Sequence, residues 1–165
     1  MTVDDRVPEE ADVLARVGDM AVDVGALAVA SNVWRAAQAL RAHVERTVLR
    51  GEDFTWAGFS ALFNLWIWGP METRELATSM SCARATISGV TDTLERRGLV
   101  ARSGDPRDRR LVRLALTDAG RERVATLFPR FNAGEAAIVR DLSDEEKTTL
   151  AALLRRVVLT AREES

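Results

Sequence analysis

The sequence contains few of the residues that build disulfides, metal sites and catalytic centres. Its 165 residues include one cysteine, Cys82, and one histidine, His43. A single cysteine excludes an internal disulfide, and without a cluster of cysteines and histidines we expect no metal site and no cofactor. The sequence also shows no glycine-rich loop that would cradle phosphates and no convergent set of acids, bases and nucleophiles. We therefore do not expect an enzyme.

Long hydrophobic runs are absent as well. No apolar stretch has the length needed to span a membrane, and the first residues do not resemble a secretory signal, so we expect a cytoplasmic protein. Hydrophobic residues make up 47% of the chain and charged residues 29%, which is typical of a soluble globular protein. At 165 residues the chain is long enough to bury a core of its own.

The most informative stretch begins at Thr73, which we expect to cap a short helix. We expect Ser81 to cap a second, longer helix that follows it. Apolar residues at helical spacing predict that Ile87, Val90 and Leu94 face inward. Two helices joined by a tight turn, the second with a low-profile polar face, are typical of a helix that enters the DNA major groove. The outward face of the second helix carries Arg84, Ala85, Ser88, Gly89 and Asp92.

At Gly98 the hydrophobic period changes from that of a helix to that of a strand. From Leu111 to Leu116 apolar side chains alternate between two faces, which indicates a half-buried strand. Residues 99–102 are the expected partner strand, and residues 103–110 form the loop between them. That loop carries Arg107, Arg109 and Arg110 among turn-forming residues. A helix-turn-helix followed by a basic hairpin is a winged helix.

Long helices are expected on both sides of this unit. One runs from about residue 21 to residue 50, Thr55 is expected to cap the next, and Thr117 opens a helix reaching to about residue 141. Ser143 and Glu146 form a capping box for a last helix. The apolar faces of these helices exceed what a small winged unit covers, which favours a homodimer. We expect a mainly α fold with a small β-hairpin, divided into an acidic segment with a dimerisation helix (1–53), the winged unit (54–120) and C-terminal dimerisation helices (121–165).

The net charge of −2 argues against a nucleic-acid partner, but its distribution argues for one. From Ser81 to Arg113 there are eight arginines and four acidic residues, a net charge of +4. Residues 1–53 carry ten acidic residues and six arginines, a net charge of −4. A local basic surface on an acidic body confines the attraction for phosphates to that surface.

Three segments resemble the signature of the MarR-type transcriptional regulators. They are Leu94-Glu-Arg-Arg-Gly-Leu-Val-Ala-Arg102, Asp105-Pro-Arg-Asp-Arg-Arg110 and Leu116-Thr-Asp-Ala-Gly120, within a resemblance that is continuous from about Phe54 to Gly120. The resemblance implies a dimer of intertwined terminal helices that binds double-stranded DNA at a pseudo-palindromic operator. The family function it implies is that of a repressor released by a small ligand.

The resemblance also assigns DNA contacts. The wing-tip aspartate and arginine of the family correspond to Asp108 and Arg110, and a carboxylate that holds a guanidinium extended would direct Arg110 into the minor groove. Arg107 and Arg109 suit phosphates, although Arg109 alternatively pairs with Asp105. Many relatives carry arginine in place of Gly89, so this chain lacks one base or phosphate contact. On the second helix the expected contacts are Ser81, Arg84, Ala85, Thr86 and Ser88, with an ordinary solvated helix surface as the alternative.

Aromatic residues crowd the first two long helices, and two interpretations stay open. One is a packed core. The other uses the resemblance, since the family binds small phenolic or carboxylate effectors in a crevice between the dimer helices and the winged unit. The lining residues expected there are Trp34, His43, Phe63 and Trp66. The competing function is a winged-helix module that contacts proteins and has no ligand response.

Overall fold

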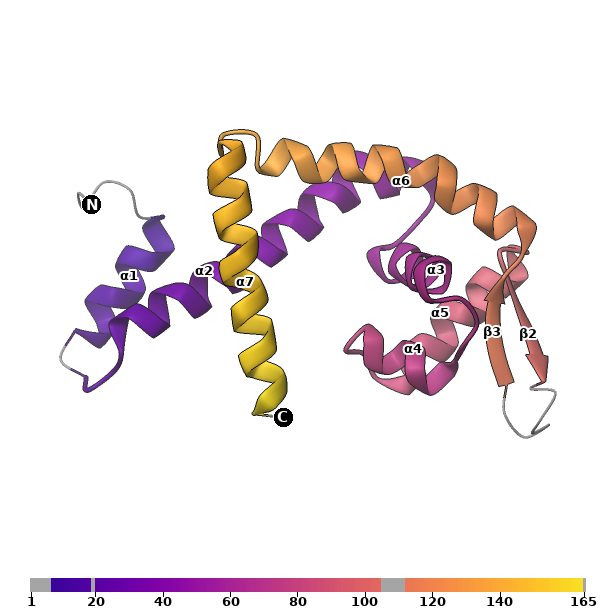
Figure 1. Ribbon diagram of the computed structural model, residues 1–165, viewed down its shortest axis with the longest axis horizontal. Coiled ribbons are helices and arrows are strands. Elements are labelled where there is room, and N and C mark those ends of the chain that lie inside the picture. Colours follow the sequence, from indigo (N-terminus) through magenta and orange to yellow (C-terminus); the bar gives the residue numbers. More distant parts are fainter. Residues whose placement is uncertain (1–6, 19, 105–111, 165) are drawn as a thin grey trace. The chain divides into compact units, whose positions relative to one another are not determined.

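The computed structural model describes residues 7–18, 20–104 and 112–164 (Figure 1). The chain divides into two compact units, residues 1–43 and residues 44–165. The mainly α fold with a small antiparallel sheet is the one predicted from the sequence. The division of the chain into three functional segments stays a prediction.

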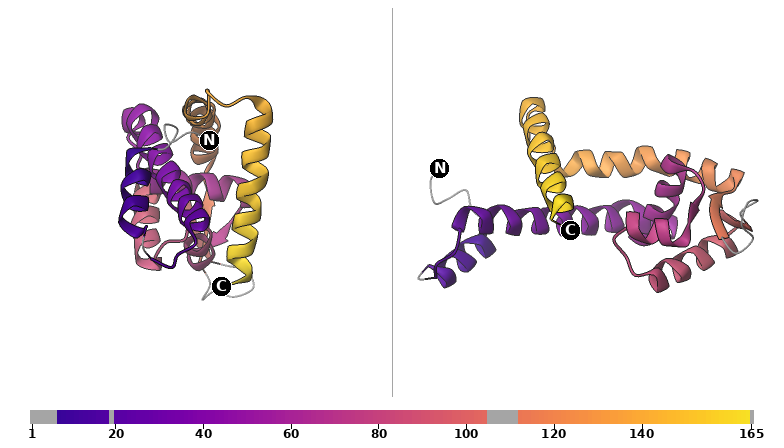
Figure 2. Two further views of the ribbon diagram at one scale, coloured as in Figure 1. Left: turned by 90° about the vertical axis from the view of Figure 1, so that its left-hand side faces the viewer. Right: turned by 60° about the horizontal axis from the view of Figure 1, so that its bottom comes forward.

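The first unit is built from two helices (Figure 2). α1 (Pro8–Val17) begins with proline and carries Glu9 and Glu10 in its first turn, where the positive end of the helix dipole favours carboxylates. The side-chain amide of Asn32, in α2 (Val24–Val44), donates a hydrogen bond of 2.9 Å to the Glu10 carboxylate. This contact helps to hold α1 alongside α2.

The second unit begins where α2 loses its regular geometry. A π-helical turn (Glu45–Leu49) and a 3-10 turn (Arg50–Glu52) follow α2, and Asp53 then adopts a left-handed conformation with φ of 57°. The sequence predicts one regular helix to about residue 50, and this prediction is wrong over its last turns. Val44 and Leu49 are five residues apart, which is the hydrogen-bond spacing of a π-helix, and both side chains are fully buried. The π-helical turn therefore lets both side chains pack in the core.

Three short helices and a three-stranded sheet form the winged part of the second unit (Figure 1). Thr55 caps the first of these helices, as predicted, by accepting a hydrogen bond of 3.1 Å from the Gly58 N–H. The side chain of Glu45 also accepts the N–H of Trp56, at 3.1 Å. In chain order the elements are α3 (Trp56–Trp68), β1 (Met71–Glu72), α4 (Thr73–Ser79), α5 (Arg84–Arg96), β2 (Val100–Gly104) and β3 (Val112–Leu116).

In the sheet β3 lies between β1 and β2, and both pairings are antiparallel. Leu116 pairs with Val100 and Val112 pairs with Gly104, so the predicted hairpin is confirmed. No pattern in the sequence indicates β1, because two residues are too few to show an alternation. The core of the unit is apolar and draws on every helix of the winged part, with Phe59, Leu62, Leu76, Ile87, Leu94, Leu114 and Leu127 all at most 2% exposed.

Two predicted helix caps are wrong. α4 is capped by Glu72, which forms a reciprocal capping box with Glu75, and Thr73 is the first residue of the helix. Ser81 does not cap α5, because it lies in the preceding turn with a left-handed φ of 49°. The residue at the N-cap of α5 is Ala83, whose side chain has no hydrogen-bonding group.

The Leu-Thr-x-x-Gly motif joins the hairpin to the next helix, α6 (Asp118–Ile138). Thr117 caps α6 by accepting the Gly120 N–H at 3.0 Å, and its hydroxyl donates to the Gly98 carbonyl at 2.7 Å. A Cβ added at Gly120 would lie 2.0 Å from the carbonyl oxygen of Leu99. Only glycine therefore permits this approach of helix and strand, which gives the motif a structural reason.

The last helix, α7 (Asp144–Glu163), begins with the predicted capping box of Ser143 and Glu146. Hydrogen bonds from the backbone and side chain of Ser143 hold the pKa of the Glu146 carboxyl below its usual value. The predicted apolar face of α7 is exposed in the single chain, with Leu150, Leu153, Leu154, Val157 and Val158 between 38% and 49% accessible.

Candidate DNA-binding surface

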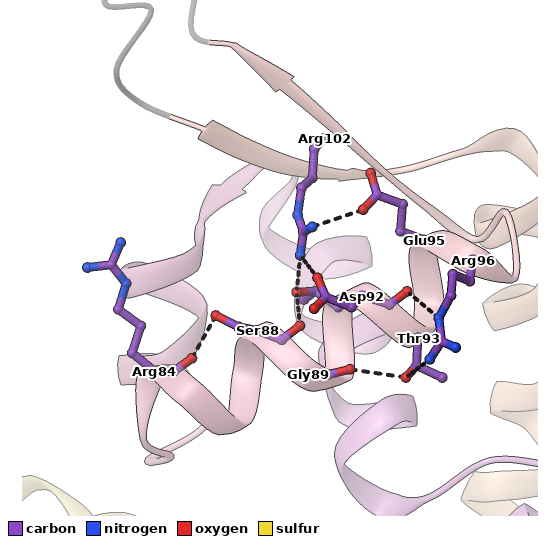
Figure 3. A network of polar contacts seen from close by, with 9 residues as sticks. Arg84, Ser88, Gly89, Asp92, Thr93, Glu95, Arg96 and Arg102 are labelled. Carbon is purple, nitrogen blue, oxygen red and sulfur yellow. Dashed lines mark hydrogen bonds and ion pairs between the residues drawn. The ribbon is translucent and has the colours of Figure 1, made fainter.

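The outward face of α5 is open to solvent and carries short side chains. Arg84 is the first residue of the helix, and Ala85, Thr86 and Gly89 are exposed with it. Ser88 is half-buried, and its hydroxyl donates to the Arg84 carbonyl at 3.1 Å (Figure 3). The structure thus brings the predicted helix residues to one end of α5, while Ser81 is exposed in the turn before it.

The inner face of α5 is only partly the one predicted. Ile87 and Leu94 are buried, but Val90 is half-buried, and Thr91 is fully buried in the row between them. The Thr91 hydroxyl donates to the Ser88 carbonyl at 3.0 Å, so its polar group is satisfied inside the helix. A buried threonine with a bonded hydroxyl costs little, which explains why it substitutes for an apolar residue.

A polar network that the sequence analysis did not find links α5 to β2 (Figure 3). Arg102 of β2 forms ion pairs with Asp92 and Glu95 of α5, the second at 3.0 Å. Its guanidinium also donates to the Thr91 hydroxyl at 3.0 Å. Arg102 is one of the eight arginines of residues 81–113, and no local spacing distinguishes it, because its partners lie on another element.

The wing-tip residues Arg107, Asp108, Arg109 and Arg110 lie outside the described residues. The strands that carry their loop are described, and the pair formed by Gly104 and Val112 closes the hairpin on either side of it. The contacts expected of these four residues remain predictions.

The aromatic residues of α3 and α6 form one cluster. Phe59 stacks on Phe131 with ring centroids 4.3 Å apart, and Phe63 stacks on Phe128 at 5.2 Å. Apolar spacing along this helix predicts that Trp66 and Ile67 also pack inward. That prediction is wrong, because Trp66, 6.0 Å from Phe63, is 39% exposed and Ile67 is 47% exposed. α3 is apolar on nearly all sides, so its periodicity could not separate the buried face from the exposed one.

A cavity of about 200 Å³ lies beside this cluster. Rings of both helices line it together with Ser60, Asn64 and Glu135. Phe63, one of the four predicted ligand residues, lines the cavity, and Trp66 lies next to it in the aromatic cluster. Trp34 and His43 belong to the first unit, where Trp34 is 65% exposed.

Neither a metal site nor a membrane-spanning helix is found among the described residues. Among those residues no group of three or more histidine, cysteine, aspartate or glutamate side chains is placed to hold a metal ion. Over the same ranges no helix has both the length and the apolar character needed to cross a membrane.

Comparison with known proteins connects this surface to a family. Residues 54–112 match the family model described as MarR family. Over 152 residues the chain is 38% identical to YwaE of Bacillus subtilis (strain 168), an uncharacterised HTH-type transcriptional regulator, and the match covers 90% of this chain and 89% of YwaE.

Solved structures show the same fold. BpsR of Bordetella bronchiseptica, whose DNA binding is regulated by 6-hydroxynicotinic acid, is 29% identical with a TM-score of 0.71, over 79% of this chain and 98% of BpsR. A mutant of MarR from E. coli, complexed with operator DNA, is 23% identical with a TM-score of 0.68, over 78% of this chain and 92% of that one. This second likeness concerns the fold alone.

The fold and the open face of α5 define a winged helix-turn-helix protein of the DNA-binding class. The chain belongs to the MarR family, the family that its sequence motifs resemble, and is a transcriptional regulator.

Proposed function

We propose that the protein is a repressor that binds a pseudo-palindromic operator as a homodimer. The observation that carries this proposal is the exposed face of α5, where Arg84 lies with the short side chains of Ala85 and Thr86. A helix face with short side chains can approach the base edges in the major groove closely. One such helix per chain reads one half-site, and a dimer reads two half-sites about one DNA turn apart.

The dimer is supported by apolar surface that a single chain leaves uncovered. Leu153 and Val157 of α7 are 49% and 44% exposed, and Val29 and Trp34 of α2 are 54% and 65% exposed. Faces of this kind on long helices are typical of helices that pack against a second subunit.

On the DNA we assign different roles to the helix and to the wing. Arg84 meets a guanine edge or a phosphate, while Ala85 and the Thr86 methyl contact thymine methyl groups. Because the Ser88 hydroxyl already donates its proton to Arg84, it is free only to accept, which suits the amino group of cytosine or adenine. Ser81, Arg107 and Arg109 contact phosphates, and Arg110, held by Asp108, enters the minor groove.

We also propose that a small aromatic ligand, phenolic or bearing a carboxylate, releases the protein from DNA. The cavity of about 200 Å³ beside Phe63 has room for one ring, since cavities of about 150 Å³ take up benzene. The parts in ligand binding expected of Trp34 and His43, which belong to the first unit, stay predictions. Regulation of BpsR by 6-hydroxynicotinic acid, a single-ring compound, supports a ligand of this size.

Selection of bound duplexes from a random pool tests the core of the proposal. We expect a pseudo-palindromic consensus and, in sedimentation, a species of about twice the chain mass of 18.2 kDa. A stable monomer that binds DNA tightly would contradict the dimer. Absence of salt-dependent binding to any duplex would instead favour the protein-contact module, against which the net charge of +4 on residues 81–113 already argues.

A further inference from the structure

The open face of α5 carries two carboxylates as well as Arg84. Asp92 lies on the exposed side of the helix with 55% of its side chain accessible, and Glu95 lies beside it with 39% accessible. DNA is a dense polyanion, so an uncompensated carboxylate on a helix that approaches it is repelled. A helix with this composition needs a cation close to both acids.

Arg102 supplies that cation from the neighbouring strand β2 (Figure 3). One nitrogen, Nη1, lies 3.0 Å from Oε2 of Glu95, and the other, Nη2, contacts Oδ1 of Asp92. The Arg102 side chain is 33% exposed, so its charge is held between the helix and the strand. Its guanidinium therefore spans the two acids.

The buried hydroxyl of Thr91 fixes the position of the Arg102 guanidinium. Nη2 of Arg102 donates to the Thr91 oxygen at 3.0 Å, and the Thr91 hydroxyl in turn donates to the Ser88 carbonyl at 3.0 Å. Thr91 is fully buried, so the surrounding side chains hold its hydroxyl in place. The bond directs the guanidinium toward α5 and leaves it to face Asp92 and Glu95.

Two roles for these ion pairs predict different results. As a structural link, partly exposed pairs of this kind add little to stability. As charge compensation they matter more, because each unit of charge next to duplex DNA changes the salt dependence of binding by about one counterion. The larger effect is thus the one on DNA binding.

We propose that Arg102 is a positioning residue for DNA binding that acts through Asp92 and Glu95. By offsetting one of the two negative charges and holding both carboxylates in ion pairs, it lets α5 approach the phosphates, and it need not contact the DNA itself. This inference rests on the proposed insertion of α5 into the major groove.

A mutant cycle on the full chain tests it, with Arg102→Ala, the pair Asp92→Asn and Glu95→Gln, and the triple variant. Affinity for the selected duplex is measured by fluorescence anisotropy at several salt concentrations, and thermal unfolding is followed in parallel. We expect Arg102→Ala to weaken binding roughly tenfold or more, because two acids are then left facing DNA. The neutral pair should bind at least as well as the parent, and the triple variant should return to within about threefold of it.

A matched control removes a different arginine from an ion pair. Arg121 pairs with Asp118 at 2.7 Å in the first turn of α6. Arg121→Ala removes the same charge from the chain, and we expect it to change affinity less than about twofold. If Arg121→Ala weakens binding as much as Arg102→Ala, net charge explains the effect and the proposal is wrong.

Several other outcomes overturn the proposal. If the triple variant is as weak as Arg102→Ala and both lose about one unit of salt slope, Arg102 contacts a phosphate directly. If all three variants lose affinity and unfold at lower temperature, the ion pairs serve the fold. Should Arg102→Ala fail to fold, the variant with Asp92→Asn and Glu95→Gln tests the proposal by itself. A loss of DNA affinity in that variant contradicts charge compensation. A parent that binds no duplex overturns the proposed function as well, whereas an unchanged Arg102→Ala overturns this inference alone.

Discussion

The guanidinium of Arg97 lies over the ring of Phe54, 4.3 Å from the ring centre. Arg97 follows the last residue of α5 and also donates to the Asp53 carbonyl at 2.6 Å. Phe54 is 7% exposed and has the Arg123 guanidinium 5.4 Å from its ring centre as well. The turn before α3 therefore holds the end of α5 through the Phe54 ring and the Asp53 carbonyl.

Phe54→Ala should destabilise the protein by about 3–5 kcal/mol, because a buried ring is lost and two cations lose their aromatic partner. Phe54→Leu keeps most of the apolar volume and should cost clearly less. Urea unfolding of the three proteins measures both values. Equal stability of the Ala variant and the parent would show that the ring does not support the end of α5.

Gly120→Ala should be among the most damaging small substitutions. The added methyl would lie 2.0 Å from the Leu99 carbonyl oxygen, so either α6 or β2 must move. We expect a loss of at least about 3 kcal/mol, or no folded protein in the soluble fraction. Gly51→Ala is the control, since among the described residues its Cβ would meet no atom within 4 Å and its stability should change by less than about 0.5 kcal/mol.

In the wing, Arg110→Ala should cost about 1–3 kcal/mol of operator binding if this residue enters the minor groove. Part of that loss should depend on sequence, through groove width. Arg107→Ala should instead weaken all duplexes alike and lower the salt slope by about one. If Arg110→Ala and the parent bind the selected duplex equally at matched salt, the assignment of the wing tip is wrong.

A ring-sized ligand should quench or shift tryptophan emission and reduce operator affinity together. Titration with salicylate-like compounds should show a coupling of about 1–3 kcal/mol between the two binding events. Phe63→Ala should weaken ligand binding, because Phe63 lines the cavity. Trp68→Ala is the control, because Trp68 is 71% exposed and does not line the cavity. Ligand binding with no change in operator affinity would contradict the proposed release.

The capping box of α7 should respond to acid. The Ser143 backbone and hydroxyl lower the folded-state pKa of Glu146 relative to the unfolded chain. A lowered folded pKa means that the stabilisation is complete above the unfolded value, about 4.5, and disappears as the pH falls through the folded value. Denaturation of the parent should therefore show a larger loss between pH 6 and pH 3 than that of Glu146→Gln. Identical pH profiles would contradict the assignment.

Local chemistry was readable from the sequence, and tertiary contacts were not. The caps at Thr55, Thr117 and Ser143 depend on residues three positions away, and all three were predicted correctly. The expected caps Thr73 and Ser81 failed, because a glutamate capping box lies one residue before Thr73 and the packing of the turn puts Ser81 in a left-handed conformation.

The candidate site shows the same limit. The open face of α5 follows from helical periodicity, so Arg84, Ala85 and Gly89 could be placed on it. The hydrogen bond between Arg102 and Thr91 joins a strand to a helix, and no pattern in the sequence predicts such a pair. The aromatic cluster was visible as composition, but its buried and exposed rings were not separable on a helix that is apolar all round.

The close joint at Gly120 makes α6 a lever arm. With its first turn held against Leu99 and Gly98, the helix cannot slide relative to the hairpin, and its 21 residues extend for about 30 Å. A shift of one ångström at the far end therefore turns the hairpin by only about two degrees. Pro129 interrupts this arm by removing a backbone hydrogen bond, so α6 bends most easily next to Phe128. Phe128 lines the cavity, so a ring bound there would press on α6 beside the point where the helix bends most easily.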